Sequence, residues 1–236
     1  MKKVIHKSSE RGKTELGWLH SLHSFSFGGY YNPDKMGFGL LRVLNDDTVE
    51  PGEGFGTHPH NNMEIISIVL SGALEHKDSM GSGSVIYSGD VQVMSAGTGV
   101  THSEFNHSKT ELVKFLQIWI VPNKRNIKPR YDQKNFDLKN MKDEIITVVS
   151  GEVSDSKMFI NQNAAISIGR LEKGKELNYK NLYPGNGTFL FVLEGSINLD
   201  NEYLNVRDAI GLYDTDDFNF SASSNTNFII IEVPLK

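Results

Sequence analysis

The chain has 236 residues, of which 38% are hydrophobic and 22% charged, and its formal net charge is −5 at pH 7. This apolar content and small charge imbalance exclude intrinsic disorder as the main state, and the acidic balance disfavours direct binding to nucleic acid. The chain has no cysteine, which excludes disulfides, thiolate nucleophiles, iron–sulfur clusters and cysteine-ligated zinc. A bound metal therefore needs His, Asp or Glu ligands.

The first residues of the chain predict neither export nor membrane insertion. Met1–Lys7 contains early lysines, but no apolar segment follows them, and no run of about 18 apolar residues occurs anywhere in the chain. We therefore expect a cytoplasmic protein that has no membrane partner.

A histidine pair marks the first motif, GEGFGTHPHNNME at 52–64. His58 and His60 are two residues apart, so on an extended strand both imidazoles point to the same face. That geometry lets two neutral ring nitrogens reach one metal ion. The pair alone also fits two histidines that are satisfied by hydrogen bonds. A short apolar run, Ile65–Leu70, follows the motif and predicts a buried strand.

A second motif, GTGVTHSE at 97–104, repeats this pattern with a carboxylate. His102 and Glu104 are again two residues apart and share one face of a strand. Two strands that each offer such a pair build a site of three histidines and one carboxylate. A site of this kind leaves open positions on the metal, as oxygen-activating non-haem iron requires.

The rest of the chain also reads as strands. Val113–Val121 and Phe228–Val233 are β-rich, and glycine-containing breaks recur along the whole sequence. Many short strands at this spacing are typical of an all-β sandwich or barrel. The best helical candidate is a short segment around residues 136–144.

Weak internal similarity indicates two related halves. Val69–Gly72 is echoed by Val192–Gly195, about 120 residues later, and all eight histidines lie in the first 107 residues. We predict an N-terminal metal-binding domain at 1–122, a connector at 123–145 and a C-terminal domain without metal ligands at 146–236. Basic residues at the start of the connector are interpreted as solvated linker rather than as a nucleic-acid patch, because no aromatic stacking surface accompanies them.

The sequence around both motifs resembles the cupin motifs, and more closely the pirin family, especially the bacterial pirin-like quercetin 2,3-dioxygenases. The stretches that carry the resemblance are HSFSFG at 23–28, MGFGLLRV at 36–43, THPH at 57–60, EHKDS at 75–79, MSAGTG at 94–99 and HSEFN at 102–106. Three departures are one extra residue before Gly72, Ser95 where many cupins have proline, and Asn61–Asn62 after the histidine pair.

The resemblance implies an all-β bicupin, in which two cupin barrels face each other with few short helices, and one divalent metal ion in the N-terminal barrel. Carried over by position, the metal ligands are His58, His60, His102 and Glu104. Many cupins use a carboxylate at the position of Glu64 instead, and we expect Glu64 to support the ligands or the packing. The expected ion is Fe(2+), with Ni, Cu, Mn or Zn as alternatives.

The resemblance further implies a metal-dependent dioxygenase. Such an enzyme uses O2 to cleave the central ring of a flavonol such as quercetin, with release of carbon monoxide, and Glu104 is the expected proton acceptor. Two other classes stay open: a pirin-like regulatory or redox-sensing protein that acts through a protein partner, and another cupin metalloenzyme. Neither direct nucleic-acid binding nor membrane binding is expected.

The remaining histidines and nearby aromatic residues receive structural interpretations. His76 and His107 are expected on the surface or in loops. His23, Phe25 and Phe27 alternate on a predicted strand, so the two phenylalanines are expected in the core or in the wall of the pocket.

Overall fold

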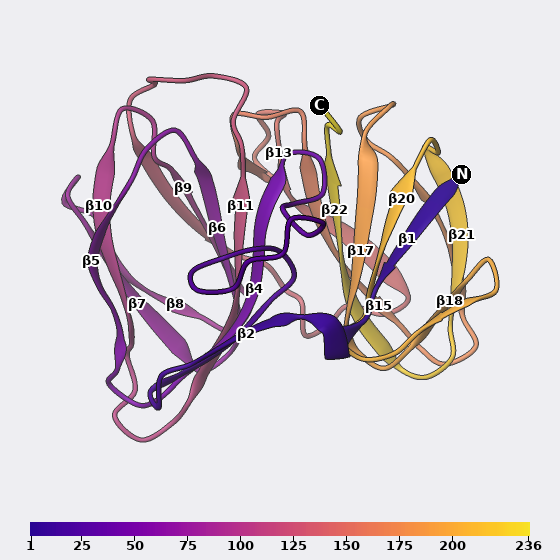
Figure 1. The fold of residues 1–236 in the computed structure, drawn as a ribbon, viewed down its shortest axis with the longest axis horizontal. Helices are drawn as coiled ribbons and strands as arrows, with labels where there is room; N and C mark the ends of the chain where they lie inside the picture. The colour runs from indigo at the N-terminus through magenta and orange to yellow at the C-terminus, as the bar shows by residue number, and fades with distance from the viewer.

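The computed structural model describes residues 1–236 and is almost entirely β-sheet. Its strands form two barrels that lie side by side, and each barrel combines a seven-stranded with a four-stranded sheet (Figure 1). The predicted all-β fold with two barrels is therefore confirmed. The only helix is a short 3-10 turn, η1 (Ser8–Glu10). None of the structure's helices has the length and apolarity that a membrane crossing needs.

The N-terminal barrel contains the residues of both motifs. Its strands are β2 (Gly12–Glu15), β3 (Leu19–His23), β4 (Leu41–Val49), β5 (Gly54–His60), β6 (Glu64–Ser71), β7 (Ala73–Asp78), β8 (Gly83–Tyr87), β9 (Asp90–Ser95), β10 (Val100–Asn106), β11 (Val113–Ile120) and β12 (Arg130–Asn135). The larger sheet has the order β12-β9-β6-β11-β4-β3-β2, and the smaller has the order β5-β10-β7-β8. All of these neighbours pair antiparallel.

The C-terminal barrel repeats this plan. Its strands are β1 (Lys2–His6), β13 (Glu144–Ser150), β14 (Met158–Phe159), β15 (Ala165–Leu171), β16 (Glu176–Lys180), β17 (Gly187–Glu194), β18 (Ile197–Leu199), β19 (Glu202–Leu204), β20 (Ala209–Tyr213), β21 (Asp217–Ala222) and β22 (Thr226–Val233). The larger sheet has the order β1-β20-β17-β22-β15-β13-β14, and the smaller has the order β16-β21-β18-β19.

The weak repeat in the sequence falls on equivalent turns of the two barrels. Gly72 lies between β6 and β7, and Gly195 lies between β17 and β18. Both glycines have φ +79°, a left-handed conformation that a side chain disfavours. The shared glycine is therefore explained by a turn that both barrels need.

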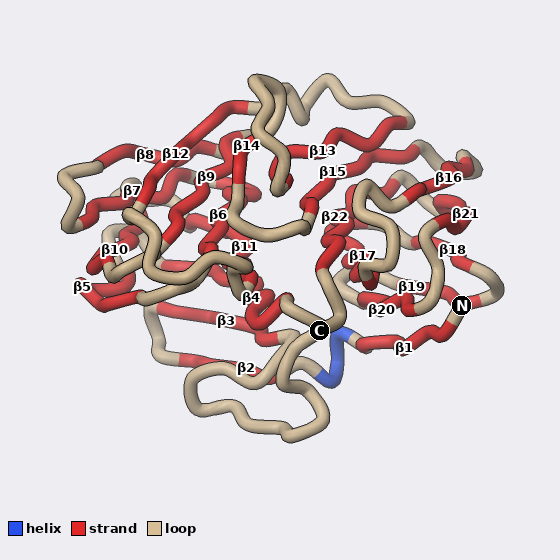
Figure 2. Tube along the Cα trace, turned by 90° about the horizontal axis from the view of Figure 1, so that it is seen from above, coloured by secondary structure: helices blue, strands red, loops and turns tan.

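Strand pairing adds detail to the predicted division at 1–122, 123–145 and 146–236, which stays a prediction. The first strand, β1, pairs with β20 and so belongs to the sheet of the C-terminal barrel (Figure 2). Within the predicted connector, β12 pairs with β9 and completes the N-terminal sheet. Chain order alone would therefore place β1 in the wrong barrel, and β12 is a strand of the N-terminal sheet that lies within the predicted connector.

The helix predicted around residues 136–144 is absent. Asp143 has φ +50°, outside the right-handed helical region, and Asn140 donates a hydrogen bond to the carboxylate of Asp137 at 2.9 Å. Phe136 and Met141 are buried. Local side-chain bonds and burial of these apolar residues therefore hold the segment as a loop.

The large sheets of the two barrels pack face to face and form the main core. Strand residues alternate between the two sides of a sheet, so Ile66 and Ile118 from one barrel meet Phe189 and Ile229 from the other in one buried cluster. Central strands such as β6 and β11 are covered on both faces, which explains their nearly continuous apolar runs.

The interiors of the barrels differ in a way that positions the functional site. A cluster of 14 buried apolar residues, contributed by both sheets, fills the C-terminal barrel. In the N-terminal barrel, polar residues occupy one row across five strands of the large sheet: His23, Asn45, Gln117, Ser67 and Gln92. All five are buried. The N-terminal barrel therefore has a polar interior suited to chemistry, whereas the C-terminal barrel has an apolar one.

Candidate metal centre

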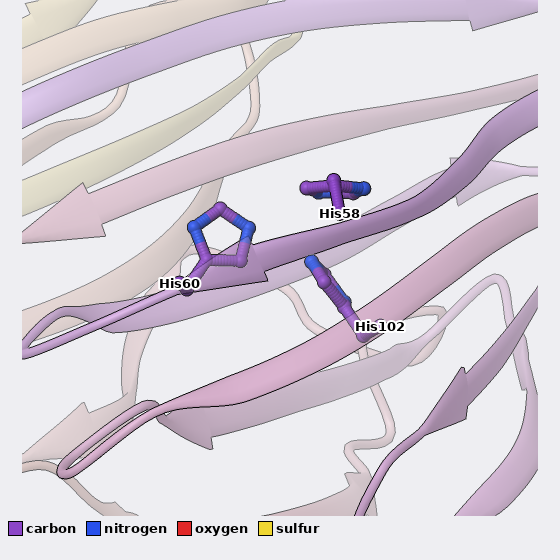
Figure 3. Close-up of side chains that lie close together, drawn as sticks. All are labelled: His58, His60 and His102. Carbon is purple, nitrogen blue, oxygen red and sulfur yellow. The ribbon is translucent and has the colours of Figure 1, made fainter.

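Two paired strands bring the three histidines of the motifs together. His58 and His60 lie two residues apart on β5, and His102 on β10 is the direct pairing partner of His58. The ring centroids of His58 and His102 are 4.4 Å apart, and those of His60 and His102 are 4.8 Å apart. In Figure 3 the rings of His58 and His60 extend from one strand and the ring of His102 from its neighbour, and the three rings lie close together.

The free nitrogens of these rings have the properties of metal ligands. One ring nitrogen from each histidine lies within 4.8 Å of the others. Nε2 of His60 and Nε2 of His102 are buried and have no hydrogen-bond partner, although buried polar atoms are normally paired. Nδ1 of His58 is 2.8 Å from the carbonyl oxygen of Gly56, which leaves its Nε2 available. The three side chains therefore fit a divalent ion.

Burial also keeps two of the histidines in the protonation state that a metal needs. Loss of solvent lowers the pKa of His60 to about 4, and the neighbouring His58 adds to the effect. Burial and the adjacent histidines lower the pKa of His102 to about 2. Both imidazoles are neutral at pH 7, and neutral imidazole is the form that binds a metal ion.

Glu104 lies on the same side of β10 as His102 and is only 2% exposed. Ser67 donates a hydrogen bond to its Oε1 at 3.1 Å, and the Gln117 amide donates to its Oε2 at 2.8 Å. Burial raises the pKa of Glu104 to about 7, against the opposing effect of these hydrogen bonds. A carboxylate oxygen of Glu104 and one ring nitrogen each of His102 and His76 lie within 4.8 Å of one another. The structure thus brings Glu104 beside His102, and the four-ligand set stays a prediction.

His76 is buried, so the prediction that it lies on the surface or in a loop was wrong. It lies on β7, whose residues pair with those of β10, and its Nδ1 is 3.4 Å from Nδ1 of His102. Its Nε2 is 3.1 Å from a carboxylate oxygen of Asp78, and its ring stacks on Tyr131 at 4.7 Å. The local sequence shows a His-x-Asp alternation, but only strand pairing reveals that it faces His102.

Glu64 takes a role outside the histidine group. Ser95 donates a hydrogen bond to its carboxylate at 2.7 Å, and Asn161 of the C-terminal barrel donates to it at 3.2 Å. Residues 61–63 interrupt the strand, so the alternation of His58 and His60 does not continue to Glu64. Glu64 therefore links the two barrels.

A cavity of about 180 Å³ opens beside the histidines. His58 and Glu104 line one side of it, and the aromatic rings of Phe27, Phe55 and Trp119 form other parts of its wall. The other lining residues are Thr14, Leu19, Ser21, His23, Gly28, Gly29, Asn45, Asp47 and Gln117. Phe27 thus lies in the pocket wall, whereas Phe25 is buried in the core between the barrels.

Comparisons with known proteins agree with this architecture. The Pirin family model matches residues 4–120, and the model described as the quercetinase C-terminal cupin domain matches residues 147–233. Quercetin 2,3-dioxygenase of Escherichia coli K12 is 37% identical over 230 residues, which cover 98% of each chain. A protein of Zymomonas mobilis named as a putative quercetin 2,3-dioxygenase is 38% identical and covers 93% of each chain.

A solved structure gives the same result in three dimensions. The bacterial pirin YhhW from Escherichia coli, crystallised in complex with nickel(II), superimposes with a TM-score of 0.93 at 36% identity. The superposition covers 99% of both chains. The whole architecture, including the arrangement of the two barrels, is therefore shared with that protein.

Proposed function

This chain belongs to the pirin family, and from that premise we propose that it is a metal-dependent dioxygenase acting on a flavonol such as quercetin. The proposed reaction uses O2 to cleave the central ring and releases carbon monoxide. The observation that supports the proposal is that three imidazoles converge, that a buried carboxylate lies beside one of them, and that an aromatic-walled cavity opens next to this group. The names of the relatives agree with it.

His58, His60, His102 and Glu104 are the residues proposed to hold one divalent ion. We propose Fe(2+), with Ni, Cu, Mn or Zn as alternatives, and nickel is the ion in the related Escherichia coli structure. When bound, such an ion supplies Lewis acidity, which lowers the pKa of a hydroxyl group that it contacts.

Glu104 is proposed to accept the proton of the substrate's 3-hydroxyl group. Burial raises the pKa of this carboxyl group in the metal-free chain, and a carboxylate beside the substrate hydroxyl can act as a general base. The hydrogen bonds from Ser67 and Gln117 fix the orientation of the carboxylate. Phe27 and Trp119, whose rings contact edge to face at 5.4 Å, form an apolar part of the cavity wall.

The overall reaction balances without an external reductant. One flavonol and one O2 give one carbon monoxide and one ester of two aromatic acids. Both oxygen atoms of O2 enter the ester, and the flavonol supplies the electrons. Turnover therefore needs only the substrate, O2 and the loaded protein.

The Glu104→Gln variant tests the role of the carboxylate. The amide preserves the shape, and its oxygen can still accept the Gln117 hydrogen bond while its nitrogen donates to Ser67. We expect quercetin turnover to fall by about 10²- to 10⁴-fold, the usual contribution of a general base. The measurement is loss of quercetin absorbance under air, with metal content determined on the same samples.

Glu64→Gln is the matched control, because Glu64 is also a buried glutamate held by two side-chain donors. It should keep turnover near that of the natural chain. Unchanged turnover in Glu104→Gln would rule out Glu104 as the base. A metal-loaded protein without any turnover would instead favour a regulatory or redox-sensing role through a protein partner, or another cupin chemistry.

A further inference from the structure

Two polar side chains of β4 form a part of the cavity wall that the proposed chemistry does not use. Asn45 and Asp47 are two residues apart, so they share one face of the strand. Both line the cavity that His58 and Glu104 also line. Asn45 is 2% exposed and Asp47 is 3% exposed. They are therefore buried polar groups that face the space available to a substrate.

Each of these side chains has one hydrogen-bonding group that the protein leaves unpaired. Oδ1 of Asn45 is 2.9 Å from Nδ1 of His23, and Oδ1 of Asp47 accepts a hydrogen bond from the hydroxyl of Ser21. No hydrogen bond within the protein reaches Nδ2 of Asn45 or Oδ2 of Asp47, and neither atom is among the fully buried atoms that lack a partner. Both atoms are therefore accessible from the cavity, where a ligand or water can pair them. The wall thus offers one donor and one acceptor side by side.

The size of the cavity limits what can occupy it. A cavity of about 150 Å³ is known to hold one benzene molecule, and this cavity measures about 180 Å³. The cavity is not closed, so one six-membered ring with small substituents fits inside it and the rest of a larger ligand extends out of its opening. The rings of Phe27 and Trp119 in the wall favour a planar aromatic occupant.

We propose that Asn45 and Asp47 determine specificity by binding the hydroxyl groups of a single aromatic ring of the substrate. This inference rests on the proposed function and names the part of the substrate that enters the cavity. In a flavonol, the only ring that is not fused is the pendant phenyl ring. That ring is attached next to the carbon that carries the 3-hydroxyl, so it can reach Asp47 while the 3-hydroxyl faces Glu104.

The test compares quercetin, whose pendant ring carries two hydroxyls, with galangin, whose pendant ring carries none. Binding of both flavonols to the nickel-loaded chain is measured by calorimetry without oxygen, and kcat/KM is measured separately under air. We expect quercetin to bind at least about tenfold more tightly than galangin, because two hydrogen bonds that the galangin ring cannot make together contribute about one factor of ten. In the Asn45→Leu and Asp47→Leu variants, the ratio of the quercetin affinity to the galangin affinity should fall toward one.

Gln92→Leu is the matched control. Gln92 is a buried amide of the same polar row and also lacks a partner, but it does not line the cavity. It should leave the preference unchanged. Asp47→Asn, which keeps the shape and one acceptor, should retain part of the preference and serves as a second variant if Asp47→Leu does not fold.

The outcomes separate this inference from the proposed function. A preference that is present in the natural chain and lost in the β4 variants supports the inference even if no flavonol is turned over. Turnover of quercetin with an equal preference in the natural chain and the β4 variants overturns the inference and leaves the proposed activity intact. Equal binding of both flavonols, or binding of neither, also overturns the inference and would mean that water pairs with Asn45 and Asp47.

Discussion

Replacing His76 is predicted to weaken metal binding although His76 is not among the proposed ligands. Its ring lies between His102 and Asp78, with contacts of 3.4 Å and 3.1 Å at its two nitrogens. A partner at Nδ1 of His102 fixes the orientation of that ring and directs its Nε2 toward the other two histidines. The variant His76→Leu removes this support and retains a buried apolar side chain.

The structure sets the size of the expected effect. His76→Leu leaves Nδ1 of His102 and Oδ2 of Asp78 without this partner, whereas Oδ1 of Asp78 keeps backbone donors from Met80 and Ser82. Loss of a hydrogen bond that supports a metal ligand typically lowers affinity by 10- to 100-fold, or about 1.4–2.7 kcal/mol. His76→Gln, which can still bond to both neighbours, should recover part of the loss.

The assay is competition between the protein and a chelator for Ni(II), with thermal unfolding as a check on folding. His107→Leu is the matched control, because His107 contacts Glu75 at 3.2 Å on the surface of the same barrel. It should bind Ni(II) as the natural chain does. Equal affinities of a folded His76→Leu and the natural chain would refute the reasoning, and a loss far beyond 100-fold would make His76 itself a ligand.

Three further predictions concern stability. Burial lowers the pKa of His6 to about 4, so the fold is fully stable above pH 6.5 and loses stability as the pH falls toward 4. In urea unfolding at pH 5, this histidine should lower the free energy of unfolding by about 2 kcal/mol, and the His6→Phe variant should not show that decrease. Identical pH profiles of the two proteins would contradict this. Phe189→Ala in the core between the barrels should cost about 3–5 kcal/mol in urea unfolding, and a cost below about 1 kcal/mol would show that this core tolerates a void. Gly97 has φ +48° and an added Cβ would lie 2.1 Å from the Ile127 carbonyl oxygen, so Gly97→Ala should lower the melting temperature, whereas Gly29→Ala, with no atom within 4 Å, should leave it nearly unchanged.

The sequence predicted the parts of the site that depend on strand alternation. His58 and His60 share a face because the side-chain period of a strand is two, and the same rule pairs His102 with Glu104. The two-barrel fold followed from frequent turn signals and from the resemblance of the motifs. Which side chains share a face of a strand depends only on their spacing along that strand, so this can be predicted from the sequence alone.

The features that the sequence missed depend on which strands become neighbours. His76 reaches His102 only because β7 pairs with β10, and the contribution of Asn45 and Asp47 requires β4 to face the strands of the motifs across the barrel. The placement of β1 beside β20 joins residues about 200 positions apart. Periodicity gives the face of each strand, but partners that are distant in the chain are fixed by packing of the whole barrel.

The most direct test of the proposed enzyme is the yield of carbon monoxide per quercetin consumed by anaerobically purified, metal-analysed protein after addition of O2. We predict about one metal ion per chain, one carbon monoxide per quercetin, and loss of both metal and turnover in His60→Ala, whose Nε2 is one of the unpaired buried nitrogens. Metal bound at the same level in His60→Ala, or quercetin consumed without carbon monoxide, would contradict the account.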